Sequence, residues 1–379
     1  MSLRVAFYSH NGFGLGHFRR NLILAQALLR RKPSADVLII TGSSGLNEFP
    51  LPLNVDCVKL PAVRKQAAGR WRPLALDIEM EHLLQLRRTI ILESVRAYRP
   101  HLFVADFLPL GVEEELRPAL EELRDRPDAR SAIGFRDVLD EPQAIREAWA
   151  AEDIPTVLRE LYDRVLVYGA ADWFDFSQYG VKGEDLTYVG LLGRAGMPKP
   201  RPPGSIRLLA TSGGGADGYP VLATTLDAID LLHDQIGGKL TCTILTGPLM
   251  PESDVERLRA VGKRVGARIH RFAEDFPGKL ARSSIVIGMC GYNTVCDVLS
   301  YRRPALFVPR PGPSREQPIR SRILADRGLS LTLPLAECTA HAMADALVSL
   351  LEDRPYPEEA LPELGGVDRS VQELLSLVA

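Results

Sequence analysis

The sequence predicts an α/β protein built from two doubly wound parallel sheets, that is, two Rossmann-like domains facing a cleft. Three observations indicate this fold class. Strand-like and helix-like segments alternate along the 379 residues, glycine-rich turns follow strand-like runs in both halves, and a proline-rich connector separates the halves. We expect an N-terminal domain over residues 1–195, a linker over 196–205, a second domain over 206–355, and a tail over 356–379 whose helix packs back on the first domain.

The composition is that of a globular protein: 46% of the residues are hydrophobic and 25% are charged. The net charge of −2 argues against nucleic acid as a partner. The five cysteines form no CxxC pair, which favours reduced thiols. The sequence begins without a signal-peptide pattern, and no apolar run approaches the roughly 18 residues of a membrane span. We therefore expect a cytoplasmic protein.

The first glycine-rich turn lies between a predicted strand over residues 3–9 and a predicted helix over 18–31. It contains Gly14 and Gly16, followed by His17 in the first turn of the helix. The spacing is a poor match to a dinucleotide fingerprint, and no acidic residue ends the second strand, so we reject NAD binding. His17 is a candidate general base, because imidazole accepts protons near neutral pH. The alternative is that it caps the helix or packs against the loop.

Two aspartates end predicted strands in the first half. Asp106 ends the run LFVAD and Asp137 ends AIGFRD. Either carboxylate could face the cleft, or could serve as a helix cap or loop hydrogen-bond acceptor. The structural role, as a cap or loop acceptor, is expected more for Asp137 than for Asp106. Asp106 is therefore a candidate catalytic residue beside His17.

The second half contains two turns suited to phosphate. The strand-like run IRLLAT leads into Ser212, Gly213, Gly214 and Gly215, and the run IVIG at 285–288 leads into Gly291 and a helix. A helix N-terminus carries backbone N–H groups that have no partner within the helix, and these bind anions. Further strands are expected at 240–247, 267–272, 305–309 and 329–334.

A proline-rich loop after the strand at 305–309 ends at Glu316 and Gln317. In open α/β sheets, ligands bind beyond the carboxyl ends of the strands. Glu316 can there accept two hydrogen bonds from ribose hydroxyls. The sequence therefore predicts a nucleotide-diphosphate pocket in the second half.

These features together resemble the GT-B glycosyltransferases, and residues 206–328 resemble the family 28 C-terminal domain, as in the branch that contains the peptidoglycan-precursor N-acetylglucosaminyltransferase. The matching motifs are the SGGG loop, Phe272 in HRFAEDF, and the pattern G-x-x-T-x-x-[ED] before PALFVP. The N-terminal half is closer to predicted bacterial glycosyltransferases, through GLGH, HFRRNLILAQAL and GFRDVLDEP. The resemblance implies that the following residues bind the donor: Gly14, Gly16, Ser212, Gly213, Gly214, Gly215, Phe272, Gly291, Tyr292, Asn293, Thr294, Glu316 and Gln317.

The resemblance implies an inverting glycosyltransferase that uses a nucleotide-diphosphate sugar, preferably a UDP-sugar, with a small-molecule or lipid-linked hydroxyl acceptor and with His17 as the base. Phe272 would lie against the base of the nucleotide. No D-x-D motif or ligand cluster is present, so we expect neither a cofactor nor a metal. The alternatives are a nucleotide-sugar hydrolase or 2-epimerase on the same fold, and a non-catalytic nucleotide-sugar sensor.

Residues 62–77, AVRKQAAGRWRPLALD, surround a tryptophan with basic residues. One interpretation is a solvated loop whose Trp71 folds onto the core. The other is a mobile lip on the acceptor side, where Trp71 stacks on a sugar or inserts at an anionic membrane. The second interpretation predicts a protein that attaches peripherally to the inner face of the membrane.

Overall fold

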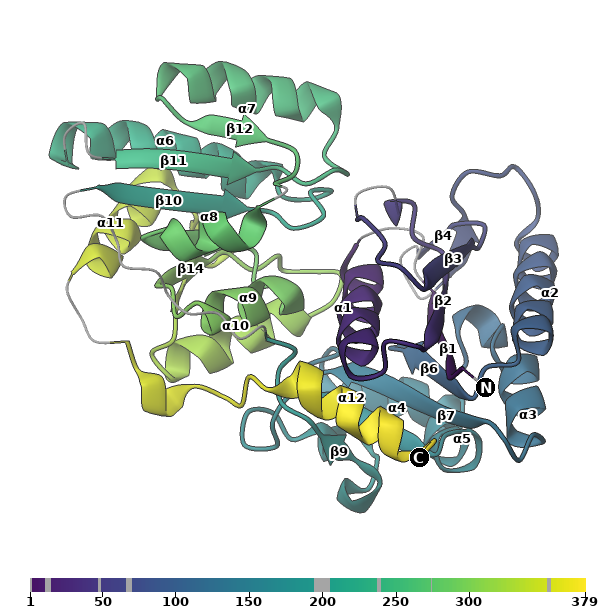
Figure 1. Ribbon diagram of the computed structural model, residues 1–379. Helices are drawn as coiled ribbons and strands as arrows, with labels where there is room; N and C mark the ends of the chain where they lie inside the picture. Colours follow the sequence, from purple (N-terminus) through teal and green to yellow (C-terminus); the bar gives the residue numbers. More distant parts are fainter. Residues whose placement is uncertain are drawn as a thin grey trace. The chain divides into compact units, whose positions relative to one another are not determined.

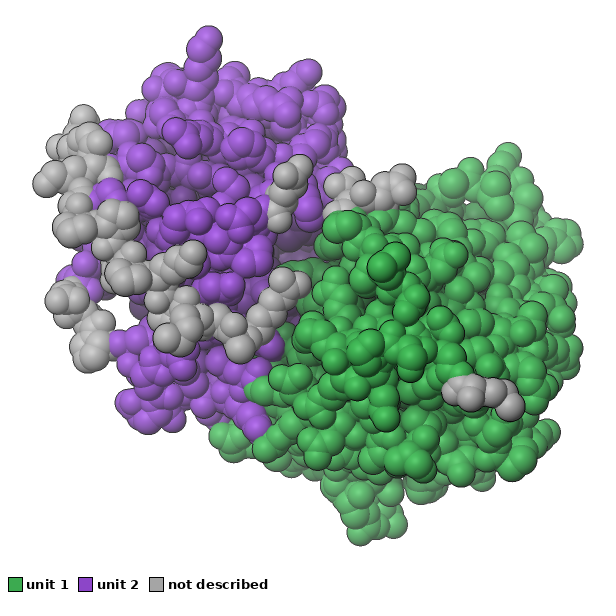
Figure 2. Space-filling model, in the orientation of Figure 1, with its two compact units in different colours: residues 1–192, 365–379 green, residues 193–364 purple. Residues whose placement is uncertain are grey.

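Two parallel sheets, each with its own core, organise the chain. The computed structural model describes residues 2–10, 15–46, 49–65, 70–193, 205–236, 240–273, 275–352 and 356–379. The chain divides into a first unit, Met1–Leu192 with Gly365–Ala379, and a second unit, Gly193–Leu364. Figure 2 shows the first unit in green and the second in purple.

The described part of the first unit contains a seven-stranded sheet in the order β3-β2-β1-β6-β7-β8-β9, and all of its pairs are parallel. Its apolar runs explain why these strands are central: β1 and β6 are almost completely buried, as expected for strands covered on both faces. The strands are β1 (Arg4–Ser9), β2 (Asp36–Thr41), β3 (Val55–Lys59), β6 (Leu102–Asp106), β7 (Arg130–Arg136), β8 (Arg164–Tyr168) and β9 (Thr187–Tyr188).

Helices cover both faces of this sheet (Figure 1). One face carries α1 and α12, which pack on each other, and the other carries α2, α3 and α5. In α12, Val367, Val371 and Leu374 recur at helical spacing and are buried, so this C-terminal helix contributes one apolar stripe to the first unit. The helices are α1 (Gly16–Arg31), α2 (Met80–Tyr98), α3 (Arg117–Arg124), α4 (Pro142–Ala151), α5 (Ile154–Leu161) and α12 (Gly366–Ser376), with 3-10 turns η3 (Val112–Glu114), η4 (Phe176–Tyr179) and η5 (Gly183–Asp185).

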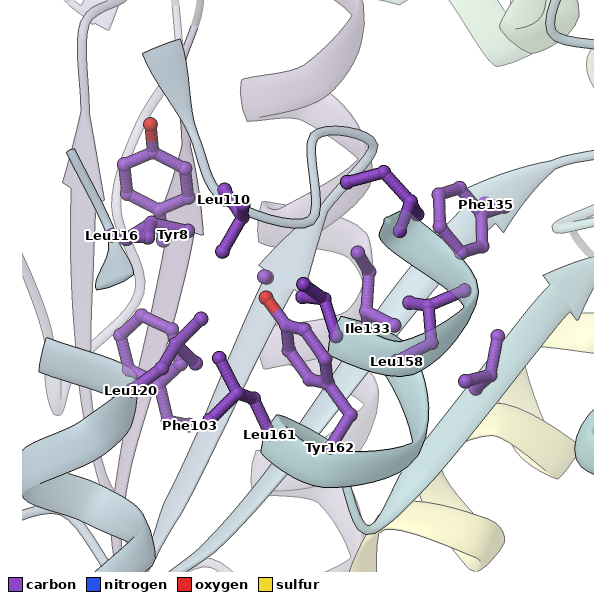
Figure 3. Packing of buried hydrophobic residues seen from close by; sticks show 14 of the residues in the cluster. Tyr8, Phe103, Leu110, Leu116, Leu120, Ile133, Phe135, Leu158, Leu161 and Tyr162 are labelled. Carbon is purple, nitrogen blue, oxygen red and sulfur yellow. The ribbon is translucent and has the colours of Figure 1, made fainter. Parts of the chain in front are cut away.

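One large cluster of the first core lies between the sheet and the helices α2, α3 and α5. Figure 3 shows Tyr8, Phe103 and Ile133 from the strands packed with Leu120 and Leu158 from the helices and with Tyr162, which follows α5. The hydroxyl of Tyr162 donates to the Pro109 carbonyl at 2.5 Å, so this buried polar atom is satisfied.

The described part of the second unit holds a six-stranded parallel sheet in the order β12-β11-β10-β13-β14-β15. Helices α6 and α11 pack together over one face, and α8 and α9 contact each other, with α8 against β10 (Figure 1). The elements are β10 (Ile206–Thr211), β11 (Leu240–Leu245), β12 (Arg268–His270), β13 (Ile285–Gly288), β14 (Ala305–Phe307), β15 (Leu331–Thr332), α6 (Tyr219–Ile236), α7 (Glu252–Arg264), α8 (Phe276–Arg282), α9 (Tyr292–Ser300), α10 (Glu316–Asp326), α11 (Ala340–Leu351), η6 (Leu335–Glu337) and η7 (Glu358–Ala360).

The predicted fold class is confirmed: both units are parallel, Rossmann-like α/β sheets. Local differences have physical reasons. The strand–helix alternation is interrupted after β6, where α3 begins only at Arg117 because Glu113 and Glu114 have positive φ angles. The segment expected as a loop over 62–77 contains an antiparallel hairpin, β4 (Val63–Lys65) with β5 (Trp71–Pro73). The second unit continues to Leu364, past the expected end at 355, and the linker predicted over 196–205 lies outside the described residues except for its last residue.

The close packing of β7 on β8 gives a stability prediction. An added Cβ at Gly134 would lie 1.8 Å from the hydroxyl oxygen of Tyr168, which is buried. Gly134→Ala should therefore destabilise the first unit by about 1–3 kcal/mol, as overpacked cores do. The measurement is the denaturation midpoint of the full chain. Gly183→Ala is the matched control, since its added Cβ has no neighbour within 4 Å, and equal midpoints for the two variants would contradict the prediction.

Candidate active site

The candidate site of the first unit lies where the strand order of its sheet changes direction. β1 pairs with β2 on one side and with β6 on the other. The carboxyl ends of β1 and β6 are adjacent, since Ser9 pairs with Asp106. A ligand crevice in an open α/β sheet is expected at this position.

Asp106 binds two side chains of α1 at that edge. Its Oδ2 lies 2.8 Å from Nδ1 of His17. The guanidinium of Arg20 donates from Nη2 to Oδ1 at 2.9 Å and to Oδ2 at 2.8 Å, and from Nε to Oδ1 at 3.1 Å. Asp106 is only 1% exposed, so it contacts solvent or substrate through His17 rather than directly.

The hydrogen bonds favour one tautomer of His17. Nδ1 also lies 2.9 Å from Nη2 of Arg20, but the hydrogens of that nitrogen already have the Asp106 carboxylate as acceptor. A carboxylate is the stronger acceptor, because its bond to a donor is charge-assisted. Nδ1 of His17 therefore donates to Asp106, and Nε2 is left with a lone pair. An imidazole oriented in this way by a carboxylate is suited to general base chemistry.

Burial lowers the pKa of His17 below 6.5, although the Asp106 carboxylate acts in the opposite direction. The guanidinium groups of Arg20 and Arg136 also lower this pKa. The position in the first turn of α1 adds to the effect, because the helix N-terminus disfavours a cation. Burial alone would raise the pKa of Asp106, but Arg20 and His17 hold it well below its ordinary range. At neutral pH the pair therefore consists of a neutral imidazole and an ionised carboxylate.

The other candidates of the first half take different positions. Gly16 is the first residue of α1, and Gly14 lies outside the described residues. Asp137 is buried, and its Oδ1 accepts the Val138 N–H at 2.7 Å, as the loop hydrogen-bond interpretation predicts.

The candidate site of the second unit occupies the corresponding position of the second sheet. β10 pairs with β11 on one side and β13 on the other, so the turns after β10 and β13 flank the change of direction. The structure therefore brings the SGGG loop and the turn at Gly291 to one edge of one sheet.

The SGGG loop is held against the neighbouring loop after β11. The hydroxyl of Ser212 donates to the Thr246 carbonyl at 2.7 Å, and the Gly213 N–H donates to Oγ1 of Thr211 at 3.2 Å. Gly215 has φ +98°, and an added Cβ would lie 2.2 Å from the Thr246 carbonyl oxygen. Only glycine fits at position 215, because two loops approach each other closely there.

The turn after β13 places a helix N-terminus at the same edge. Gly291 is the N-cap of α9, whose first turn contains Tyr292, Asn293 and Thr294. An added Cβ at Gly291 would meet no atom within 4 Å, so the surface beside the helix start is open. The preceding Cys290 is buried with φ +61°, an unusual conformation for a residue with a side chain. A helix start of this kind attracts anions.

Two arginines hold the end of the proline-rich loop. Glu316 is buried as the first residue of α10, with Nη2 of Arg310 3.5 Å from its Oε1 and Nη2 of Arg320 3.9 Å from its Oε2. Arg320 is fully buried and donates from Nη1 to the Cys290 carbonyl at 3.1 Å, which links α10 to the turn before α9. The side chain of Gln317 accepts the Arg310 N–H at 3.0 Å.

Phe272 lies two residues beyond the end of β12 rather than on the strand expected over 267–272. Its side chain is 41% exposed. An exposed aromatic ring after an edge strand can lie against a planar base. Within the second unit, the structure thus collects the predicted donor residues at the carboxyl ends of β10, β12, β13 and β14.

Four residues at or beside these two sites were not predicted from the sequence: Arg20, Arg310, Arg320, and His10, whose ring lies 4.9 Å from that of His17. The i,i+3 spacing of His17 and Arg20 and the i,i+4 spacing of Glu316 and Arg320 were available signals. For a possible metal site, no three His, Cys, Asp or Glu side chains come together in the described ranges.

Known glycosyltransferases resemble this chain in sequence and in structure. Residues 213–372 match the model of the glycosyltransferase family 28 C-terminal domain. Over its whole length the chain superposes on the glycosyltransferase of kitacinnamycin (TM-score 0.64, 16% identity, 100% of both chains) and on MurG of Acinetobacter baumannii (TM-score 0.61, 15% identity, 99% of both chains). The chain has the GT-B fold.

Two curated relatives share part of the sequence. Both are named UDP-N-acetylglucosamine–N-acetylmuramyl-(pentapeptide) pyrophosphoryl-undecaprenol N-acetylglucosamine transferase. The protein of Rhodopseudomonas palustris (strain HaA2) is 30% identical over 153 residues, 40% of either chain. The protein of Rhodospirillum rubrum is 33% identical over 162 residues, 42% of this chain and 40% of the relative. The chain thus aligns with about two fifths of these relatives' length.

The contacts of Glu316 give a binding prediction. Glu316→Gln keeps the size of the side chain but removes the charge that would strengthen hydrogen bonds from ribose, so affinity for UDP should fall by about 1–1.5 kcal/mol per weakened bond, roughly 5- to 10-fold. The measurement is calorimetric titration with UDP. Glu337→Gln, at an exposed position in η6, is the control. Equal affinities for the two variants would remove Glu316 from the nucleotide site.

Proposed function

We propose that this protein is an inverting, metal-independent glycosyltransferase that moves a sugar from a nucleotide-diphosphate sugar, in the first place a UDP-sugar, to a hydroxyl acceptor. The observation that carries the proposal is the His17–Asp106 pair at the switch point of a GT-B first unit. The family match over 213–372 supports the donor side, because it covers the SGGG loop after Ser212, the turn at Gly291, and Glu316.

In the proposed reaction, Nε2 of His17 takes the proton of the acceptor hydroxyl. The acceptor oxygen forms a bond to C1 of the donor sugar from the face opposite the nucleotide, and the bond between C1 and the diphosphate oxygen breaks with its electron pair on the diphosphate. Asp106 stabilises the imidazolium that forms. The N-terminus of α9 faces growing negative charge on the leaving diphosphate, which provides electrostatic assistance without a divalent ion.

The acceptor is assigned by chemistry alone. The family model covers little of the first unit, so the acceptor in the relatives' name is not carried over. We propose a hydroxyl acceptor, either a small molecule or a lipid-linked one, and a cytoplasmic protein with peripheral membrane contact.

The test of the proposed reaction is turnover by the full chain. Incubation with UDP-, GDP- and dTDP-sugars, with and without an acceptor mixture, should release nucleotide from the preferred donor faster when acceptor is present. Equal release in both cases would identify a nucleotide-sugar hydrolase, and binding without release would identify a sensor. A change of the sugar with the nucleotide still attached would identify an epimerase.

The His17–Asp106 pair gives a catalytic prediction. His17→Ala should lower UDP release by roughly 10²- to 10⁴-fold, and Asp106→Asn should act in the same direction because it no longer fixes the tautomer of His17. Because the pKa of His17 is lowered, release should persist below pH 6.5 and fall only when the imidazole gains a proton. His341→Ala, on the exposed surface of α11, is the control. Near-normal release by His17→Ala would refute the assignment of the base.

The hairpin β4–β5 and the segment after it carry the membrane proposal. Arg64, Lys65, Arg70 and Arg72 are exposed, and Leu76 and Ile78 are exposed apolar residues in the same segment. Basic residues near an anionic surface contribute about 1 kcal/mol each, and exposed apolar side chains add burial at the interface. No helix in the described ranges is long and apolar enough to cross a membrane.

This segment predicts salt-sensitive binding to anionic vesicles. Vesicles of phosphatidylcholine with phosphatidylglycerol should sediment with the protein at low salt and less at high salt. Changing Arg64, Lys65, Arg70 and Arg72 to Gln should abolish the binding. The matched control changes four exposed basic residues of α7 in the same way, namely Arg257, Arg259, Lys263 and Arg264. Absence of binding by the unaltered protein, or equal loss in both variants, would eliminate this proposal.

A further inference from the structure

A group of rings surrounds His17 on the first unit. His10 follows β1, and its ring centroid lies 4.9 Å from that of His17 with the planes at 68°. Phe107 follows β6, and its centroid lies 5.4 Å from His17 and 5.7 Å from His10. Trp71 of the hairpin lies edge-on to His10 at 5.8 Å. Three segments far apart in the sequence therefore contribute rings to one cluster around His17 and His10.

His10 has a polar atom without a partner. The residue is 5% exposed, and its Nδ1 makes no hydrogen bond to any of the residues that the structure describes. A buried polar atom in this state costs roughly 1–3 kcal/mol, so it needs an explanation. Burial also holds the pKa of His10 well below 6.5, so the ring is neutral and offers one donor and one acceptor.

The position of His10 is fixed by a buried ion pair. Arg87 donates to the His10 carbonyl at 3.2 Å, and from Nε and Nη2 to the Glu115 carboxylate at 2.5 and 2.6 Å. The hydroxyl of Tyr8 donates to the same carboxylate. Since Arg87, Glu115 and Tyr8 are fully buried, the backbone at His10 is anchored to both β1 and α2.

Phe107 is held in a strained conformation beside both histidines. Its φ of +77° is unfavourable for a residue with a side chain, at a cost on the order of 1–3 kcal/mol. Its N–H still donates to the Gly134 carbonyl at 3.0 Å, so the strain does not come from a broken sheet ladder. The guanidinium of Arg136 lies 4.8 Å from the ring centroid. Strain of this kind is concentrated at sites that place a side chain for a ligand.

We propose that His10, Phe107 and Trp71 form an acceptor subsite for a hydroxyl-bearing sugar ring, in which Nδ1 of His10 binds a hydroxyl adjacent to the one that His17 deprotonates. The inference rests on the proposed function and specifies the substrate class on its acceptor side. Trp71 and Phe107 supply aromatic surface for the apolar face of a pyranose. A ligand hydroxyl gives Nδ1 the hydrogen bond that the protein does not provide. His10 is then an acceptor-positioning residue and His17 remains the base.

The experiment measures binding of a defined probe class to the full chain. Methyl and p-nitrophenyl pyranosides of the common hexoses are titrated calorimetrically in the presence of UDP. His10→Phe keeps a ring but removes both nitrogens, and His10→Asn places an amide near the position of Nδ1. We expect His10→Phe to weaken binding of the best pyranoside by about 5- to 100-fold, and His10→Asn to restore part of the loss. The control His341→Phe, on α11, should bind as the unaltered protein does.

Trp71→Ala tests the same subsite without changing a buried residue, because Trp71 is only partly buried. It should weaken pyranoside binding several-fold and leave UDP affinity unchanged. This variant still tests the subsite if His10→Phe does not fold. Failure of the unaltered protein to bind any pyranoside, or equal pyranoside affinities for the unaltered protein and Trp71→Ala, would overturn the subsite. Failure of the proposed function is recognised separately, as a lack of nucleotide release from every donor.

Discussion

The carboxylate of Asp106 is the group on which the arrangement of the first unit's site depends. It ends a fully buried strand, and a buried carboxylate is stable in its ionised form only when it is paired and hydrogen-bonded. Arg20 satisfies this condition with three hydrogen bonds, which leaves Oδ2 able to accept from His17 as well. The three residues come from two elements, so the end of β6 and the first turn of α1 are fixed relative to each other. Orientation of the imidazole follows from this constraint rather than from the glycine-rich turn that precedes it.

Both units use the same topological position for polar chemistry, but they supply different groups there. In the first sheet the switch point carries side chains with perturbed pKa values, His17 and Asp106. In the second sheet it carries backbone, through the SGGG loop and the N-terminus of α9, with Glu316 beside them. A titratable group is needed to move a proton, and a helix N-terminus is suited to hold phosphate without exchanging protons. This difference in chemistry is what the proposed function requires of an acceptor side in the first unit and a donor side in the second.

The sequence was sufficient to predict the sheets, because apolar runs that are buried on both faces need no information from distant residues. It was also sufficient to select His17, Asp106, Gly291 and Glu316 as candidates, since each follows a strand or opens a helix. It did not predict that His17 and Asp106 would contact each other across 89 positions, and it treated them as alternatives. The buried arginines Arg20 and Arg320 were missed because arginine is rarely buried unless it is paired, and the sequence analysis examined the acidic partners alone. The hairpin at Trp71 was missed because each of its strands has only three residues, which is too short for an alternation of apolar and polar positions to be recognised.

The contacts of Glu316 have a consequence for how a nucleotide binds. Arg310 lies near this carboxylate and also donates to Asp217 at 3.0 Å, just beyond the SGGG loop. In the proposed complex, a ribose whose hydroxyls donate hydrogen bonds to Glu316 must share the carboxylate with Arg310, or displace Arg310 toward the diphosphate. Arg320 has no such freedom, because it is fully buried and bound to the Cys290 carbonyl. One arginine therefore fixes the carboxylate to the turn that precedes α9, while the partly exposed one can follow the ligand. In the proposed complex, Arg310 can therefore change its position with the ligand while Arg320 stays bound to the turn before α9.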